Sequence, residues 1–292
     1  MVAYRDLSGV RMQPEIIAHH HPATGTVTYL VVDPATLLCA IVDPVLDFDP
    51  ETEATDTSFV DAIIAQIRAR DMGPTWILET GLHAAHLSAA GHLKYETGAS
   101  VCIGAGVIES LKRLAPAMGE HGVDLDGWDF DKLAQDGEVM PMGGLEITAH
   151  AVTGRLPGAV AYQIGDAVFT GDVILAPGLG AGRADLPGAD AQALYAAARK
   201  FLSLPDDTRL MAGWEAAEGA ATTTVAQQRA QNVQLRDGVD LPTFVAARQA
   251  ADAALPSLPY AAQALRVAIR SGKLPPQGDD GRRFPPTDIP SF

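Results

Sequence analysis

The sequence predicts an α/β protein in which two β-sheets stack face to face and helices cover the outer side of each sheet. Three observations predict this fold class. β-rich runs occur in both halves of the chain, segments with apolar residues at helical spacing follow in each half, and this order of strands and helices occurs twice. With 292 residues, of which 47% are hydrophobic and 20% charged, the chain is long enough to bury a sizeable core.

The first half begins with a predicted hairpin. Residues 26–44 hold two β-rich runs around the turn "DPAT", and residues 58–73 have apolar residues at helical spacing before the stop signal Gly73. The segment "PTWILET" has the composition of a buried strand. The remaining elements expected in this half are a helix at 87–98, a strand at 99–104 and a helix with a proline break at 107–119.

The second half returns to β character after an irregular acidic stretch at 124–138. Strands are expected at 145–152 and 159–172, and the tight turn Gly165-Asp166 divides the latter into a pair. A helix at 190–204 and a strand at 208–214 follow. From about residue 220 we expect a largely helical segment with a proline-rich tail.

The net charge limits the classes of partner. A formal charge of -15 repels a phosphate backbone, and no basic cluster with interleaved aromatic residues offsets it, so we expect no nucleic acid partner. The same charge gives no long-range attraction for an anionic small molecule, and such a ligand would need local arginines.

Targeting and cysteine chemistry give no further signal. No run of 18 apolar residues occurs, and "MVAYRDLSGVRMQPE" has charges where a signal peptide needs apolar residues, so we expect a cytoplasmic protein without a membrane partner. Cys39 and Cys102 lack the spacing of a thiolate metal site, and both are expected to be buried free thiols.

The stretch "TGLHAAHLSA", residues 80–89, places two histidines three apart where a strand passes into a helix. At such a position His83 and His86 can face one cavity and bind a metal ion. They can equally be hydrogen-bonded residues that satisfy local polar groups. The spacing alone does not decide between these interpretations.

Several segments together resemble the metallo-β-lactamase fold in its persulfide dioxygenase and glyoxalase II-like branch. "ILETGLHAAHLSAAGHLKYETGA" resembles the segment that carries a THxHxDH motif in that family, and "GDAVFTGDVIL" resembles the segment of its bridging aspartate. The resemblance runs from about residue 13 to about residue 285. It implies a four-layer αββα sandwich, with residues 1–292 as a single domain and metal ligands on loops where the two sheets meet.

The resemblance also implies that most metal ligands have been replaced. The first histidine and the aspartate of the motif fall on Gly81 and Ala85, and the later histidines fall on Arg155 and Trp214. The family ligands retained are His83, His86 and Asp172. A tight metal site needs three or four ligands that meet at one point, and an arginine beside a divalent ion adds repulsion. We therefore expect no bound metal or other cofactor, with iron or zinc as the alternative.

Arg155, at the position of the family's loop histidine, leads to a specific expectation. An unpaired carboxylate at Asp172 would be costly to desolvate, so we expect an ion pair between Arg155 and Asp172, which can be bidentate. We expect the Trp214 side chain to fill the space that the second metal would have used.

Other candidate residues have two interpretations each. Arg183 and Asp185 resemble family residues near the substrate thiol, where Arg183 either clamps a ligand carboxylate or pairs with Asp185. Histidines 19 to 21 are expected in a solvated loop before the first strand, with an edge metal site as the alternative. Glu215 is expected in a solvated loop, or else as a carboxylate in the pocket. "GLGAG" does not follow a strand and open a helix, which excludes a dinucleotide site of the usual type.

Three functions remain open. The first is a catalytically silent or altered member of the fold that binds a small molecule or a partner through the old pocket. The second is an active metal-dependent hydrolase or sulfur dioxygenase with a rearranged site; no serine nucleophile motif supports a metal-independent hydrolase, and Ser88 is unfavourably spaced from His86. The third is a structural subunit of a homodimer that pairs through the apolar helix "YAAQALRVAIRSG".

Overall fold

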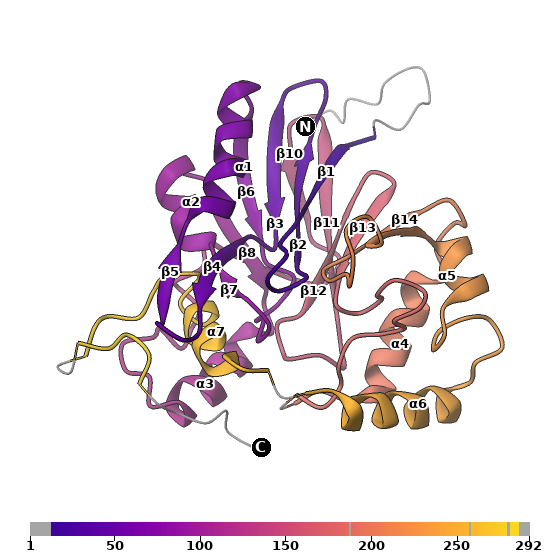
Figure 1. Cartoon of the computed structure of the whole chain (residues 1–292). Coiled ribbons are helices and arrows are strands. Elements are labelled where there is room, and N and C mark those ends of the chain that lie inside the picture. The colour runs from indigo at the N-terminus through magenta and orange to yellow at the C-terminus, as the bar shows by residue number, and fades with distance from the viewer. Residues whose placement is uncertain (1–12, 187, 257, 279–280, 286–292) are drawn as a thin grey trace.

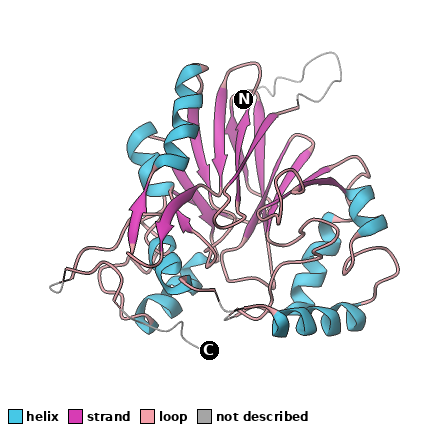
Figure 2. Ribbon diagram, viewed as in Figure 1, coloured by secondary structure: helices cyan, strands magenta, loops and turns pink. Residues whose placement is uncertain are grey.

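A computed structural model describes residues 13–186, 188–256, 258–278 and 281–285 of the chain. Two mixed six-stranded sheets lie face to face, and helices cover both outer faces (Figures 1 and 2). The predicted four-layer sandwich is therefore confirmed. The signal-peptide argument rests mainly on residues 1–12, which lie outside the described residues.

The first sheet has the strand order β1-β2-β3-β6-β8-β9. The strands from β1 to β3 are antiparallel, and β3, β6, β8 and β9 are parallel. Their bounds are β1 (Glu15–His20), β2 (Val27–Val32), β3 (Leu38–Val42), β6 (Gly73–Leu78), β8 (Ser100–Gly104) and β9 (Lys132–Ala134).

The second sheet has the order β10-β11-β12-β13-β14-β15, and only its β13–β14 pair is parallel. Its bounds are β10 (Val139–Met142), β11 (Leu145–Ala151), β12 (Val160–Ile164), β13 (Ala167–Gly171), β14 (Arg209–Ala212) and β15 (Thr222–Thr224). A third, small sheet that the sequence did not predict joins β5 (Ala54–Asp56), β4 (Val45–Asp49) and β7 (Leu87–Ser88).

Helices form the two outer layers. Those against the first sheet are α1 (Ser58–Ala69), α2 (Ala90–Thr97), α3 (Val107–Ala117) and α7 (Ala261–Ala268), and those against the second are α4 (Ala191–Phe201), α5 (Val225–Gln231) and α6 (Leu241–Ala254). Helix α1 buries Val60, Ile63, Ile64 and Ile67, the helical spacing on which its prediction rested. In the described residues no helix is long and apolar enough to cross a membrane.

Apolar side chains fill the space between the sheets. Tyr29 of β2 packs edge to face on Phe169 of β13 with ring centroids 5.3 Å apart, and both side chains are buried. Cys39 and Cys102 are buried free thiols, as predicted, and burial raises their pKa values to about 12 and about 11. The sheets are thus held rigidly enough to position the loops at their ends.

The predicted solvated loop at His19–His21 is wrong. His19 and His20 end strand β1, and His21 is 3% exposed, with its ring nitrogens 3.0 Å from Asp47 Oδ1 and 2.9 Å from Thr24 Oγ1. The helix that suggested a homodimer also has its apolar side covered. In α7, residues such as Ala264, Leu265 and Val267 are buried inside the chain itself.

Candidate functional site

The residues singled out in the sequence lie on loops that follow the carboxyl ends of four strands. Gly81, His83, Ala85 and His86 follow β6, and Arg155 follows β11. Asp172 comes directly after β13, with Arg183 and Asp185 further along the same connection, and Trp214 comes after β14. Three of these strands, β11, β13 and β14, belong to the second sheet and β6 to the first, so the site joins the two halves of the fold.

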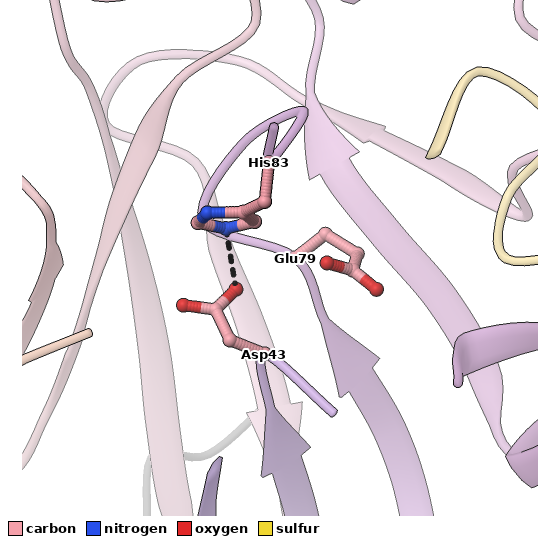
Figure 3. A group of neighbouring side chains, drawn as sticks. All are labelled: Asp43, Glu79 and His83. Atoms are coloured by element: carbon pink, nitrogen blue, oxygen red, sulfur yellow. Dashed lines mark hydrogen bonds and ion pairs between the residues drawn. The ribbon is translucent and has the colours of Figure 1, made fainter. Parts of the chain in front are cut away.

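Asp43, after β3, is the buried centre of the site. Its Oδ1 accepts hydrogen bonds from the Thr80 backbone N–H at 2.7 Å and from His83 Nε2 at 3.2 Å, and its Oδ2 accepts the Thr80 hydroxyl at 2.7 Å. Figure 3 shows the Asp43 and His83 side chains directed at one another, with Glu79 beside them. Asp43 has a φ of 47°, a left-handed conformation that is uncommon for a non-glycine residue. The surrounding hydrogen bonds hold it in place.

The charges in this cluster are strongly coupled. Burial disfavours the imidazolium of His83, but the adjacent Asp43 carboxylate outweighs burial and raises the pKa of His83 to about 9. Burial and then the charge of Asp43 raise the pKa of Glu79 to about 7, although the Ser88 hydroxyl donates to the Glu79 carboxylate. The carboxylates around His83 therefore favour its protonated form.

The predicted ion pair between Arg155 and Asp172 is confirmed. Arg155 Nη2 donates to Asp172 Oδ2 at 2.8 Å, and the two side chains are 14% and 23% exposed. The pair is not bidentate, because Arg155 Nη1 donates to the backbone carbonyl of Arg183 instead. His83 Nδ1 lies 3.9 Å from the same Asp172 oxygen. Asp172 therefore faces two cationic side chains.

Residues of the turn between β1 and β2 form hydrogen bonds with His86 and Trp214. His86 Nδ1 lies 3.2 Å from Thr26 Oγ1, and its ring stacks on His83 with centroids 4.7 Å apart. Burial and the charge of His83 hold the pKa of His86 well below its usual range. Trp214 Nε1 donates to the Thr24 carbonyl at 2.8 Å, and a Cβ on Gly25, whose φ is +70°, would lie 2.5 Å from that nitrogen.

Glu215 is buried, which corrects the expected solvated loop. It is 2% exposed, its Oε2 accepts the Ala221 N–H at 2.7 Å, and its Oε1 lies 3.1 Å from His20 Nδ1. Arg183 makes the internal pair that was one of its two interpretations, with Nε and Nη2 donating to Asp185 at 2.9 and 2.6 Å. The partners of Glu215 reach it only in the folded chain, so local pattern did not reveal its burial.

A cavity of about 450 Å³ opens above these residues. Its polar wall includes His83, His86, Arg155, Asp172 and Arg183, and Arg248 of α6 joins them. Its apolar wall is formed by Leu175, Leu179, Leu186, Trp214, Leu255 and Tyr260, among others. A separate void of about 20 Å³, room for about one water molecule, lies between Gly81, His83, Arg155 and Asp172.

The sequence analysis missed Asp43, Glu79 and Arg248. Asp43 and Glu79 each come directly after an apolar strand run, and an acid in that position is the sequence signal by which they could have been found. The ligand atoms of Asp43, Glu79 and His83 lie within 4.8 Å of one another, a spacing that a metal ion can bridge. Among the described residues, however, their hydrogen bonds to each other, to Thr80 and to Ser88 already occupy much of that donor set.

Comparison with known proteins gives the family. The metallo-beta-lactamase superfamily matches residues 19–214. The chain is 38% identical over 275 residues to a beta-lactamase hydrolase-like protein of Xylella fastidiosa, a match that covers 93% of this chain but 64% of that relative. It is 37% identical over 283 residues to a probable metallo-hydrolase of Burkholderia pseudomallei, covering 90% and 95% of the two chains.

A solved structure agrees on the fold. ETHE1 from Myxococcus xanthus superposes with a TM-score of 0.71 at 24% identity, covering 89% of this chain and all of that one. The relatives' names describe hydrolase-like proteins, and this chain shares their sequence over most of its length. The αββα sandwich, the match over residues 19–214 and the identity to these relatives lead to one conclusion: the chain belongs to the metallo-beta-lactamase superfamily.

Proposed function

We propose that this chain is a metal-free member of the superfamily that binds a small molecule in the 450 Å³ cavity. The observation that carries the proposal is the ion pair of Arg155 and Asp172, 2.8 Å long, at residues that the resemblance places among the family's metal ligands. A guanidinium keeps its proton at neutral pH, and the Arg155 guanidinium donates a hydrogen bond to a carboxylate oxygen that a metal ion would need as a ligand. The family relationship supplies the fold, and the cavity supplies the binding volume.

The other donors support the same proposal. Both ring nitrogens of His83 face carboxylates, with Nε2 3.2 Å from Asp43 Oδ1 and Nδ1 3.9 Å from Asp172 Oδ2, and these partners favour the protonated ring over a free lone pair. Gly81 and Ala85 offer no side-chain donor, and the indole N–H of Trp214 is a donor only. The positive charges of Arg155 and His83 beside Asp172 together equal that of one divalent ion. This site therefore does not fit a transition metal in the manner of its family.

Metal analysis of protein purified without added metal tests the proposal. We expect less than about one tenth of an equivalent of iron or zinc, because the three neighbouring ligand residues Asp43, Glu79 and His83 are already engaged in hydrogen bonds. Near-stoichiometric iron or zinc that is lost in a His83→Gln variant would overturn it.

Restoration variants give a matched control. A Cβ on Gly81 meets only ordinary contacts, 3.6 and 3.7 Å from Ala159, so a side chain can begin there without a clash. We expect Gly81→His alone to bind no zinc, since Arg155 still holds Asp172. Gly81→His with Arg155→His should bind zinc measurably, because it frees the carboxylate and adds two imidazoles. Zinc binding by the single variant would contradict the assigned role of Arg155.

A metal-dependent hydrolase is the second candidate. It is favoured by the probable metallo-hydrolase to which the chain is 37% identical, and by the Asp43, Glu79 and His83 group. The same metal analysis separates the candidates, because the hydrolase requires a bound ion and the binding protein does not.

A further inference from the structure

The wall of the large cavity is rich in cations. His83, Arg155, Arg183 and Arg248 line it, whereas Asp172 is the acidic side chain among the described lining residues. The other carboxylates that pair with these cations lie behind the wall. Asp43 contacts His83, Asp185 contacts Arg183 and Asp252 lies 2.9 Å from Arg248. A chain with a net charge of -15 thus directs positive groups toward this one volume.

Arg248 is a buried guanidinium with unused hydrogen-bonding capacity. Its side chain is 4% exposed, and Nη1 donates to the Ala181 carbonyl and, at 3.3 Å, to Gln234 Oε1. Its Nε has no hydrogen-bond partner within the described parts of the chain. An unsatisfied buried donor on a charged group is costly, and native structures rarely leave one without a function.

Leucine side chains also line the cavity, and they favour a ligand with an apolar part. Leu175, Leu179 and Leu186 come from the connection between β13 and α4, and Leu255 follows α6. Burial of an alkyl chain against them is favourable, because each methylene group is removed from water. One cavity therefore offers both cationic groups and an aliphatic surface.

We infer that the cavity binds a small amphiphilic monoanion, a carboxylate with an apolar chain, and this inference rests on the proposed binding function. The carboxylate lies against the guanidinium groups, whose planar donors match its geometry. A dianion fits less well, because Asp172 and the carboxylates that pair with the lining arginines would repel its second charge.

The test uses octanoate and its neutral isostere octanamide as probes, with the full chain and calorimetric titration. We expect octanoate to bind about tenfold more tightly than octanamide, the margin of one charge-assisted hydrogen bond. Added salt should weaken the binding of octanoate and leave that of octanamide unchanged, because only the first involves ionic attraction.

Variants locate the site. Arg183→Gln removes a lining cation that is 21% exposed, and it should reduce the preference for octanoate severalfold. Arg229→Gln is the matched control: it removes an arginine that pairs with Asp206 and Asp237 and is absent from the cavity wall, and should leave the preference unchanged. Ala85→Trp should block both probes by filling the cavity.

The outcomes separate the two proposals. Equal affinity for octanoate and octanamide, both lost in Ala85→Trp, would overturn the anion preference and leave the binding function intact. A preference for octanoate that persists in Arg183→Gln but is lost in Arg229→Gln would place the anion elsewhere and also overturn the inference. Failure of both probes to bind the folded wild-type chain would count against the binding function itself.

Discussion

Arg155 and Asp172 form a partly buried pair whose two members depend on each other. Replacing Arg155 by alanine leaves the Asp172 carboxylate with His83 as its nearest cation, 3.9 Å away, and frees the Arg183 carbonyl. We expect Arg155→Ala to lower the free energy of unfolding by about 2 kcal/mol, and the double variant with Asp172→Asn to lose less than the sum of the two single changes.

Urea unfolding of the four proteins in this cycle measures the coupling. Arg209→Ala serves as the control, since the Arg209–Asp166 pair is more exposed, at 29% and 26%, and should contribute less than about 1 kcal/mol. A coupling energy near zero between Arg155 and Asp172 would show that the pair does not replace a structural ion.

The raised pKa of Glu79 predicts how this residue makes the free energy of unfolding depend on pH. Its pKa is raised from 4.5 to about 7 by burial and then by the charge of Asp43, so the folded protein binds more protons than the unfolded chain in that window. The contribution of Glu79 to stability should therefore fall as pH rises from about 4.5 to 7, by up to about 3 kcal/mol, while the lowered pKa of His86 acts in the opposite direction.

Glu79→Gln removes this titration while keeping an oxygen that accepts the Ser88 hydroxyl. Urea midpoints of the variant should rise between about pH 5 and 6.5, because His86, whose pKa is held well below its usual range, binds a proton there only in the unfolded chain. A fall at higher pH should remain, because His83, with its pKa raised to about 9, loses its proton there in both proteins. An unchanged wild-type slope in Glu79→Gln would contradict the assignment to Glu79.

At the scale of elements, local pattern predicts long helices and paired strands better than it predicts short strands. Helix α1 was expected because Val60, Ile63, Ile64 and Ile67 repeat at helical spacing, and the β2–β3 hairpin because its turn is marked by "DPAT". Strand β7 has two residues and exists through its pairing with β4, so the expected helix at 87–98 begins only at Ala90. No local signal specifies such a partner.

The same distinction applies to the site. The resemblance placed the loops that carry His83, Arg155 and Asp172, and the charge argument predicted one contact among them. The burial of His21 and Glu215 depends on Asp47, His20 and Ala221, which approach only when the strands assemble. Burial of a charged residue by distant partners is a tertiary effect.

Helix α7 is attached to the end of α3 by a buried ion pair. Arg266, 1% exposed, donates from Nε to Glu120 Oε1 at 2.6 Å and from Nη2 to the Met118 carbonyl at 3.0 Å. Glu120→Ala leaves this guanidinium buried without its carboxylate, so we expect a loss of about 3 to 5 kcal/mol and earlier proteolytic cleavage around α7.

Thermal unfolding and limited proteolysis check this prediction. Glu109→Ala on α3 is the matched control, because Glu109 is 64% exposed in its pair with Arg113 and should contribute less than about 0.5 kcal/mol. Equal effects of the two changes would show that the Glu120 pair does not anchor α7.

For the whole molecule, the core between the two sheets predicts one cooperative unfolding unit. Phe169 of β13 is fully buried there against Tyr29 of β2, so Phe169→Ala removes contacts that belong to both sheets and should lower the free energy of unfolding by about 3 to 5 kcal/mol. Because the sheets share this core, circular dichroism and tryptophan fluorescence should shift together. Fluorescence reports on both halves, since Trp76 lies in β6 and Trp214 follows β14. Val139→Ala on β10, where the side chain is 51% exposed, is the control and should change little. Two separated transitions, with only one moved by Phe169→Ala, would mean that the sheets unfold as independent units and that the chain contains two domains.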